Sequence, residues 1–306
     1  MNALLKAGNV DFVLEQGAWR LYAKHRDGTT TETAISTYID DVGTSATGTL
    51  QLKAIFNDKV FPTTKPIGLI HKLVEIANAK NDDLIVDFFA GSSTAAHAIM
   101  QLNAEDGGNR KFIMVQLPEA CDKNTEAYNA GFKNISEIGK ERIRRAGEQI
   151  RKEIEEENRQ TKLGEEPKSV PDIGFRVFKI GDTNMKDVYY SAAEYSQETI
   201  EGLIDNVKED RTDLDLLYQV LINWGLPLDL KHEMEEIDGF TIHIVDTDAL
   251  IACFEPNIPE SVMRKIAEKK PLRAVFRDGS FRDSPGKLNI EGIFKTIAPD
   301  TTLRVI

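Results

Sequence analysis

The stretch from Leu84 to Thr94 combines an apolar strand with a turn whose residue types suit ligand binding. Leu84–Val86 are predicted to form a short buried strand, and the small and apolar residues from Ala95 to Leu102 predict a helix packed closely on a sheet. In open α/β sheets, ligands bind at the carboxyl ends of the strands, where exposed backbone and helix N-terminal N–H groups converge. The sequence therefore predicts a ligand-binding turn between this strand and this helix.

The side chains of this turn favour a cationic or hydroxylated ligand. Asp87 stands at the end of the strand, where its carboxylate would face the ligand and would repel a phosphate. Gly91 lets the backbone approach a ligand closely. The hydroxyls of Ser92, Ser93 and Thr94 are predicted to cap the helix or to reach the ligand. A nucleoside with an ammonium group fits this set, and the alternative is an ordinary N-capped turn without a ligand.

Residues 87–94, Asp-Phe-Phe-Ala-Gly-Ser-Ser-Thr, resemble the S-adenosylmethionine motif of DNA amino-methyltransferases, whose usual form is Asp-Pro-Phe-x-Gly-Ser-Gly-Thr. Phe88 replaces the proline of that motif. Ser93 replaces a glycine, which adds a β-carbon where the backbone is expected to need unusual torsion angles. The resemblance implies S-adenosylmethionine as the cofactor, bound by Asp87, Phe89, Gly91, Ser92 and Thr94.

A second motif precedes the first along the chain. Phe61-Pro62-Thr63-Thr64-Lys65-Pro66 leads into an apolar predicted helix that ends near Ile76. It resembles the Phe/His-Pro-Thr-x-Lys-Pro element of the β-class amino-methyltransferases, which contacts the methionine end of the cofactor. The resemblance adds Phe61, Thr64 and Lys65 to the cofactor site. A proline that simply begins a helix is the alternative, but it does not explain the order of the two motifs.

The segment Lys111–Gln116 is predicted to be the next strand. Gln116 stands where a ribose-binding acid usually lies, and its amide can bond ribose hydroxyls; Glu119 is a second candidate. The run Phe-Ile-x-Val-Gln-Leu-Pro-Glu resembles the modification subunits of type III restriction-modification systems. Further parts of that resemblance, which covers nearly the whole chain, are Gly131–Ile135, Arg142–Arg145 and Leu303–Ile306.

The resemblance implies site-specific methylation of adenine N6 in DNA, but one motif of that family is missing. No Asp-Pro-Pro-Tyr, which would contact the amino group of the flipped base, occurs in the chain. In the β-class this motif and the target-recognition region precede the Lys-Pro motif. We therefore expect the C-terminal part of a longer enzyme, without catalytic residues and inactive alone. The alternatives are a non-catalytic interaction subunit of the same kind of complex, or a methyltransferase with another substrate such as RNA.

The composition is that of a globular chain of about two domains, since 41% of the 306 residues are hydrophobic and 29% are charged. No secretory signal and no apolar run of the ~20 residues that cross a membrane is evident. Cys121 and Cys253 are isolated, which predicts a reducing compartment, the cytoplasm, and no zinc site. His97, His232 and His243 lack metal-ligand spacing, so no metal site is expected.

The net charge of −12 argues against a DNA-binding surface on this stretch, so DNA contacts are expected through the intact protein. Basic residues do occur on a helix predicted near 136–157. They alternate with glutamates, which favours a solvated mixed-charge face over a basic strip. The residues in question are Lys140, Arg142, Arg144, Arg145, Arg151 and Lys152.

The predicted fold class is α/β: part of a Rossmann-like S-adenosylmethionine-dependent methyltransferase sheet, followed by a second α/β (α+β) C-terminal domain. Residues 1–45 are predicted to begin with a short helical stretch and to form a β-ribbon, the tail of the target-recognition region. Its strands are Trp19–Ala23 and Thr33–Tyr38 around Asp27-Gly28. Residues 46–160 are the partial methyltransferase domain, in which a linker over 43–48 leads to a helix at 50–56. A polar linker follows over 158–170.

Residues 170–306 are predicted to be an assembly domain. Strands are expected at 175–180, 240–245, 249–254 and 272–276. The helix Leu214–Leu226 carries more apolar residues than one face needs, which predicts burial on two sides. The expected partners are a second modification subunit, giving a homodimer, and the restriction subunit, with no membrane contact. The alternative is a self-contained domain that buries this helix in its own core.

Overall fold

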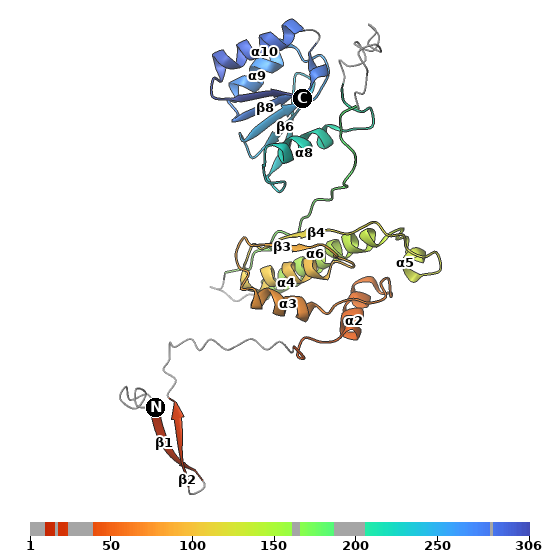
Figure 1. The fold of residues 1–306 in the computed structure, drawn as a ribbon, viewed down its shortest axis with the longest axis vertical. Coiled ribbons are helices and arrows are strands. Elements are labelled where there is room, and N and C mark those ends of the chain that lie inside the picture. Colours follow the sequence, from red (N-terminus) through yellow and green to blue (C-terminus); the bar gives the residue numbers. More distant parts are fainter. Residues whose placement is uncertain (1–9, 16–17, 24–38, 161–165, 187–205, 282–283) are drawn as a thin grey trace, which may run out of the picture. The chain divides into compact units, whose positions relative to one another are not determined.

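The structure of the chain, a computed structural model, describes residues 10–15, 18–23, 39–160, 166–186, 206–281 and 284–306. The chain divides into two compact units, Met1–Phe175 and Arg176–Ile306. Each unit combines helices with strands (Figure 1), so the mixed α/β class is confirmed.

The first unit begins with an antiparallel hairpin of β1 (Val10–Glu15) and β2 (Ala18–Ala23), in which Glu15 stands opposite Ala18. The expectation of a helical start is wrong for Val10–Glu15, because this β-prone run is only two residues away from a second one and pairs with it. Strand β2 therefore pairs with β1. Its predicted partner, Thr33–Tyr38, lies outside the described residues.

Helix α2 (Ser45–Phe56) begins earlier than predicted, so the linker expected over 43–48 is wrong from residue 45 onward. The cause is a capping box: Thr44 and Thr47 exchange hydrogen bonds between their hydroxyls and backbone N–H groups, at 3.5 and 3.2 Å. Leu52 and Phe56 of this helix pack in a small core with Val60, Ala127 and Ile138.

The centre of the first unit is the strand–turn–helix that the sequence predicts. Strands β3 (Leu84–Asp87) and β4 (Lys111–Met114) pair in parallel, with Val86 opposite Ile113. Between them runs α4 (Thr94–Asp106), and α3 (Ile67–Ile76), the short α5 (Glu126–Asn129) and the long α6 (Ile135–Arg159) complete the unit. Apolar residues of α4 and α6 form one core with Phe112 and Met114 of β4. Figure 1 shows α3, α4 and α6 on the same side of the strand pair.

The opposite face of the strand pair is uncovered within the described residues. Leu84, Val86, Ile113 and Val115 point to that face and are 54, 42, 47 and 38% exposed. Strands β3 and β4 each pair only with one another among the strands described. Parallel sheets in folded proteins have both faces covered. The strand pair therefore has the character of a piece of a larger sheet.

The second unit is a five-stranded sheet in the order β5-β6-β7-β8-β9, antiparallel from β5 to β7 and parallel from β7 to β9. One face packs on helices α9 (Glu260–Glu268) and α10 (Ser284–Ile297), and the other on α8 (Asp213–Asn223). A 3-10 turn, η1, follows β8 at Asp278–Ser280. The strands are β5 (His232–Ile237), β6 (Phe240–Val245), β7 (Leu250–Cys253), β8 (Arg273–Phe276) and β9 (Thr302–Val305).

Three of the four strands predicted in this unit are present as β6, β7 and β8. The fourth, over 175–180, is wrong: the segment has strand-like alternation, but among the described residues its backbone pairs with no strand. Ile180 is fully exposed there. The segment contacts the rest of the second unit through a side chain instead, since the Arg176 guanidinium donates to the Leu230 carbonyl at 2.8 Å. A segment with strand propensity forms a strand only where a neighbouring strand is available to pair with it.

Helix α8 is buried on one broad face. Leu216, Leu217, Val220 and Leu221 are at most 3% exposed and pack in one core with β6, β7 and β8 residues. Leu214 and Ile222 are 43 and 63% exposed. Within the described residues the unit's own core buries one side of this helix, and burial of its second side in an assembly stays a prediction.

Candidate functional site

The turn between β3 and α4 has a strained backbone. Asp87 Oδ1 accepts the Phe89 N–H at 3.1 Å, and Ala90 donates its N–H to the Val115 carbonyl at 3.1 Å. Gly91 and Ser93 both have positive φ, 51° and 57°. Ser93 thus occupies the left-handed region that residues with a β-carbon rarely adopt, as expected for a position where the resembled motif has glycine.

Two predicted residues from other segments meet this turn at Gly91. The Gly91 N–H donates to Gln116 Oε1 at 2.7 Å, and Gln116 Nε2 donates to the Leu117 carbonyl at 3.2 Å. The Phe61 ring lies next to the glycine, 3.5 Å from where a β-carbon at Gly91 would stand. The structure therefore brings Phe61, Gly91 and Gln116 together. Both polar atoms of the Gln116 amide are already used inside the chain, and its contact with ribose stays a prediction.

The segment that contains Thr64, Lys65 and Pro66 passes closely over helix α2 at Gly48. A β-carbon at Gly48 would stand 2.3 Å from the Thr64 carbonyl oxygen and 2.6 Å from the Lys65 carbonyl carbon. Gln51 of the same helix accepts the Ile67 N–H through Oε1 at 3.0 Å. Thr64 is 1% exposed, whereas the Lys65 side chain is exposed. Helix α2 thereby fixes the course of the segment that is predicted to contact the cofactor.

The hydroxyls of the turn do not cap α4, so the first of the two roles predicted for them is wrong, and contact with a ligand stays a prediction. The N-cap residue Ser93 makes no side-chain hydrogen bond to the helix. Ser92 Oγ and Thr94 Oγ1 instead accept hydrogen bonds from one guanidinium nitrogen of Arg142 on α6, at 3.0 and 2.6 Å. A buried cation attracts these oxygens more strongly than a neutral backbone N–H does.

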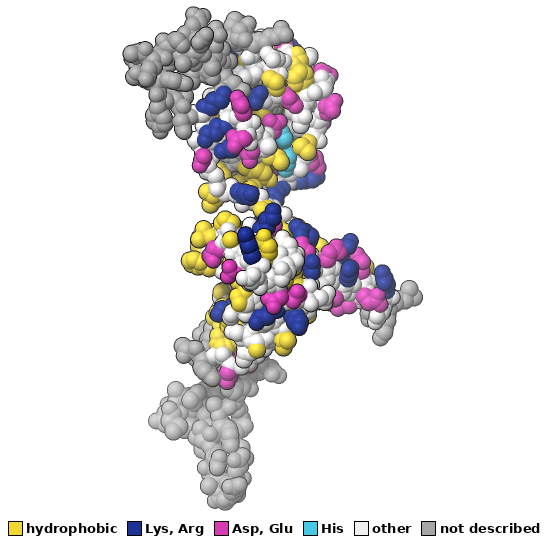
Figure 2. Space-filling view, turned by 90° about the vertical axis from the view of Figure 1, so that its right-hand side faces the viewer, with side chains coloured by type: hydrophobic (Ala, Val, Ile, Leu, Met, Phe, Trp, Pro, Cys, Tyr) yellow, Lys and Arg dark blue, Asp and Glu magenta, His cyan; other side chains and the backbone are white. Residues whose placement is uncertain are grey.

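Arg142 is the residue of this site that sequence reasoning missed. The alternation of basic residues with glutamates predicts that Arg142 lies on a solvated mixed-charge face, but its side chain is completely buried. A signal was present, because Arg142 is four residues from both Ile138 and Ala146 and so shares their apolar stripe. The mixed-charge face itself is real. It includes Arg145 with Glu141 and Arg151 with Glu148, each paired at 2.7 Å, and Figure 2 shows basic and acidic side chains interleaved on the surface.

Burial lowers the pKa of two basic groups behind the turn. His97, 4% exposed on α4, has its pKa lowered to about 3, first by burial and then by the charges of Arg142 and His71. His71 lies on α3, and its Nε2 atom is 3.2 Å from the carbonyl oxygen of Ala98 on α4. Burial also lowers the pKa of Arg142 to about 10, which leaves this guanidinium charged at neutral pH. His97 is neutral there.

The aromatic residues of the turn lie outside this buried network. The Phe89 side chain, predicted to touch the cofactor, is 89% exposed, and that of Phe88 is 69% exposed. Leu117, just beyond β4, is 67% exposed. These side chains extend the uncovered apolar face of the β3–β4 pair rather than lining an enclosed pocket.

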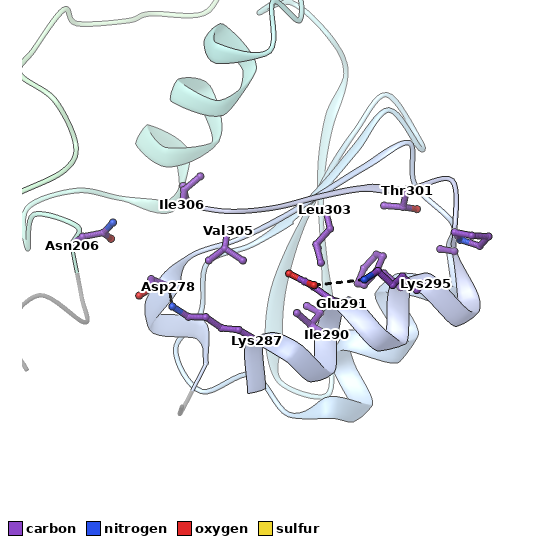
Figure 3. Close-up of a pocket in the computed structure, with 13 residues that line it drawn as sticks. Asn206, Asp278, Lys287, Ile290, Glu291, Lys295, Thr301, Leu303, Val305 and Ile306 are labelled. Atoms are coloured by element: carbon purple, nitrogen blue, oxygen red, sulfur yellow. Dashed lines mark ion pairs between the residues drawn. The ribbon is translucent and has the colours of Figure 1, made fainter. Parts of the chain in front are cut away.

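The second unit offers a cavity whose charged residues are paired. The cavity has a volume of about 690 Å³ and lies between β9 and α10, with Leu303, Val305 and Ile290 among its walls. Figure 3 shows its charged residues joined in two ion pairs, Lys287 with Asp278 and Lys295 with Glu291. Each of these four charges is therefore matched by an opposite charge nearby.

The two histidines of the second unit form a packed pair. His232 Nε2 and His243 Nδ1 are 3.1 Å apart and the rings stack, while Asp213 Oδ2 lies 3.6 Å from His243 Nε2. Within the described ranges, no three histidine, cysteine or carboxylate side chains are grouped so as to hold a metal ion. No helix in the described part of the chain is long and apolar enough to cross a bilayer.

Comparison with known proteins supports the resemblance. Residues 22–122 match a family model described as DNA methylase. The chain is 36% identical over 183 residues to the type III restriction-modification enzyme StyLTI Mod subunit of Salmonella typhimurium, across 60% of this chain and 24% of that protein. It is 44% identical over 99 residues to the EcoPI Mod subunit of Escherichia phage P1, across 32% of this chain and 15% of that protein.

A third relative extends the match into the second unit. The chain is 26% identical over 265 residues to the EcoP15I Mod subunit of Escherichia coli, across 82% of this chain and 36% of that protein. The predicted kinship with type III modification subunits is thereby confirmed. In each of these three comparisons the matched region spans between 15 and 36% of the length of the relative.

Proposed function

We propose that this relative of the type III modification subunits acts as part of a site-specific DNA adenine-N6 methyltransferase that uses S-adenosylmethionine. The observation that carries the proposal is the gathering of Phe61, Gly91 and Gln116 at the end of β3, inside the region matched as DNA methylase. The bound cofactor would supply a methyl group activated by a sulfonium. The chain's own residues would bind and orient it.

The residues of the turn fit such a ligand. Asp87 uses Oδ1 for the Phe89 N–H, which leaves Oδ2 to accept from an ammonium or a ribose hydroxyl. Gly91 allows close approach of the backbone, and Phe61 offers an apolar surface beside it. The exposed Lys65 stands on the segment held by α2. Methyl transfer itself would need the Asp-Pro-Pro-Tyr motif, which the chain lacks.

The strand pair β3–β4 belongs, in this proposal, to a larger Rossmann-like sheet. The support is the uncovered face of Leu84, Val86, Ile113 and Val115 and the unpaired outer edges of both strands among the described residues. Further strands and a covering helix would bury that face. The net charge of −12 leaves DNA contacts to other parts of the intact protein.

The proposed cofactor role of Asp87 is tested by calorimetric titration of the chain with S-adenosylmethionine. We expect weak binding by the wild-type chain, because only part of the pocket is present, and a loss of at least about tenfold in affinity in Asp87→Ala, since a charge-assisted hydrogen bond is removed. Asp83→Ala, an exposed aspartate just before the same strand, is the control and should bind as the wild type does. Equal affinity in Asp87→Ala and wild type would remove Asp87 from the site.

The second unit is proposed to be the assembly module for a second modification subunit and for the restriction subunit. Supporting this is the match of 82% of the chain, which extends into the second unit, to a Mod subunit of a type III system. We expect residues 176–306 alone and the full chain to sediment as dimers in analytical ultracentrifugation at micromolar concentration, and residues 1–175 as a monomer. A monomeric 176–306 would contradict the assembly role.

A further inference from the structure

Strand β9 has a free edge. It is the last strand of the sheet in the second unit, and among the described residues no strand pairs with its outer side. On its inner side, the N–H groups of Thr302 and Ile306 donate to carbonyl groups of β8 and of the residue before it, both at 2.9 Å. Bonding alternates along a strand, so Leu303 and Val305 direct their N–H and C=O groups outward. Such an edge is a template for pairing with another chain.

The cavity between β9 and α10 forms a groove beside this edge (Figure 3). Leu303 and Val305 are half-buried and form one wall, and Ile290 and Phe294 of α10 are part of the other. The charged side chains around the groove are joined to one another in ion pairs. An extended segment lying along β9 would therefore find apolar surface for one set of its alternate side chains.

The opposite face of β9 is basic. Arg304 of β9 and Arg273 of β8 place their guanidinium carbons 5.9 and 5.7 Å from the centre of the Trp224 ring. Within the described ranges neither arginine forms an ion pair with a carboxylate. A guanidinium over an aromatic ring is held in place, while its N–H groups stay available to a carboxylate. This face therefore attracts acidic side chains.

The groove and the basic face lie on opposite sides of one strand. Leu303 and Val305 point to the groove, whereas Arg304 lies over Trp224, and Figure 3 shows Ile306 turned away from the groove. A strand added beside β9 has the same alternation, since successive side chains of a strand point to opposite faces. The segment that fits is therefore apolar toward the groove and acidic toward Trp224.

The other edge of the sheet does not suit such a segment. Strand β5 forms that edge and exposes Glu233, Glu235 and Glu236. Like charges on neighbouring strands repel, so this edge opposes pairing with an acidic strand. Of the two edges of the sheet, the edge of β9 is the one with complementary charge.

A second copy of the chain fits the β9 edge less well than a different protein does. A dimer with two-fold symmetry would pair β9 antiparallel to itself. The register that sets Leu303 opposite Val305 of the other copy also sets the two Arg304 side chains directly opposite one another, and like charges in that position destabilise a strand pair. The acidic segment therefore belongs to another protein, and the dimer proposed for the second unit would form through another surface.

We infer that the free edge of β9 binds, as an added strand, an extended segment of another protein in which apolar and acidic residues alternate. The apolar side chains lie in the groove beside α10, and the acidic ones lie over Arg273 and Arg304. The inference rests on the proposed assembly role of the second unit and deepens it, because it gives the surface and the chemistry of the segment bound there. Main-chain hydrogen bonds supply affinity, and the two sets of side chains supply specificity.

The test is the binding of synthetic peptides to the full chain, measured by nuclear magnetic resonance. The probe alternates valine with glutamate over about six residues, the usual length of a strand. One control peptide has lysine in place of glutamate, and a second has the composition of the probe with all glutamates before the valines. Exchange of the backbone N–H groups of Leu303, Arg304 and Val305 with solvent is measured with and without peptide.

The valine–glutamate peptide should bind at least about tenfold more tightly than either control peptide, since it alone adds charge-assisted hydrogen bonds to the arginines while its valines fill the groove. It should slow exchange at the Leu303 and Val305 N–H groups, which face outward. Exchange at Arg304, whose N–H faces β8, should not change.

Variants of the full chain identify the parts of the site. Val305→Pro removes an outward N–H from an edge strand, where proline is tolerated, and should abolish peptide binding. Arg273→Gln combined with Arg304→Gln should abolish the preference for glutamate over lysine. Lys295→Gln changes a lysine beside the groove that is paired with Glu291; it is the control and should bind as the wild type does. Thermal unfolding of each variant verifies that it folds.

Three outcomes would overturn the inference. The valine–glutamate peptide fails to bind or leaves exchange at Leu303 and Val305 unchanged; it binds no better than the lysine peptide; or Val305→Pro turns a dimeric full chain into a monomer in ultracentrifugation, which would assign the edge to a second copy. The assembly role is judged separately, by the sedimentation of residues 176–306. Its failure and the failure of the β9 edge are therefore distinguishable.

Discussion

Gly48→Ala is expected to lower the free energy of unfolding by about 3 kcal/mol, the upper range for overpacking a closed interior. Gly48 lies inside α2, where alanine normally stabilises a helix by up to about 1 kcal/mol. Here a β-carbon would stand 2.3 Å from the Thr64 carbonyl oxygen. Backbone atoms cannot rotate away as a side chain does, so α2 and the Lys-Pro segment must separate. Urea unfolding followed by circular dichroism measures the loss.

The matched control for this substitution is Gly292→Ala. Gly292 also lies inside a helix, α10, but nothing stands within 4 Å of where its β-carbon would be. This substitution should stabilise the chain by up to about 1 kcal/mol. If Gly48→Ala is as stable as Gly292→Ala, then α2 does not hold the segment that contains Thr64 and Lys65.

The local parts of the cofactor site could be predicted from the sequence because their signals are local. An apolar strand, a small-residue turn and a helix follow one another over 84–102, and the structure has β3, the turn and α4 in those places. The left-handed Ser93 follows from comparison with a motif that has glycine there. Short-range patterns therefore identify where the backbone bends and which side chains stand at the bend.

The contacts that hold the site together could not be predicted in this way. Arg142 bonds residues 48 and 50 positions away, and no periodic pattern says which buried charge meets which hydroxyl. The sequence predicts that Gly48 lies in a linker, and only the structure shows that the Thr64 carbonyl packs against it. The strand predicted over 175–180 is wrong for the converse reason, since its local pattern is suitable but no strand in the described part of the chain pairs with it. Tertiary pairing decides all three cases.

The second large effect expected is a loss of stability in mild acid caused by His97. Its pKa in the folded chain is about 3, below its usual 6.5, because burial and the charges of Arg142 and His71 oppose protonation. The unfolded chain binds the proton more readily, so this contribution to stability is complete above pH 6.5 and is lost as the pH falls from there toward 3. Well inside that range the slope is about 1.4 kcal/mol per pH unit.

The variant His97→Gln distinguishes the loss of stability caused by His97 from the losses caused by other titrating groups. Glutamine carries a polar side chain without a proton to gain, so the variant should lose less stability than the wild type between pH 7 and pH 5, by about 2 kcal/mol from the linkage slope. The carboxylates and His232 contribute equally to both proteins because they are present in each. Urea unfolding at pH 7, 6 and 5 gives the two curves. Parallel curves would show that His97 accepts a proton in the folded chain, which requires an open path from solvent to the core between α4 and α6.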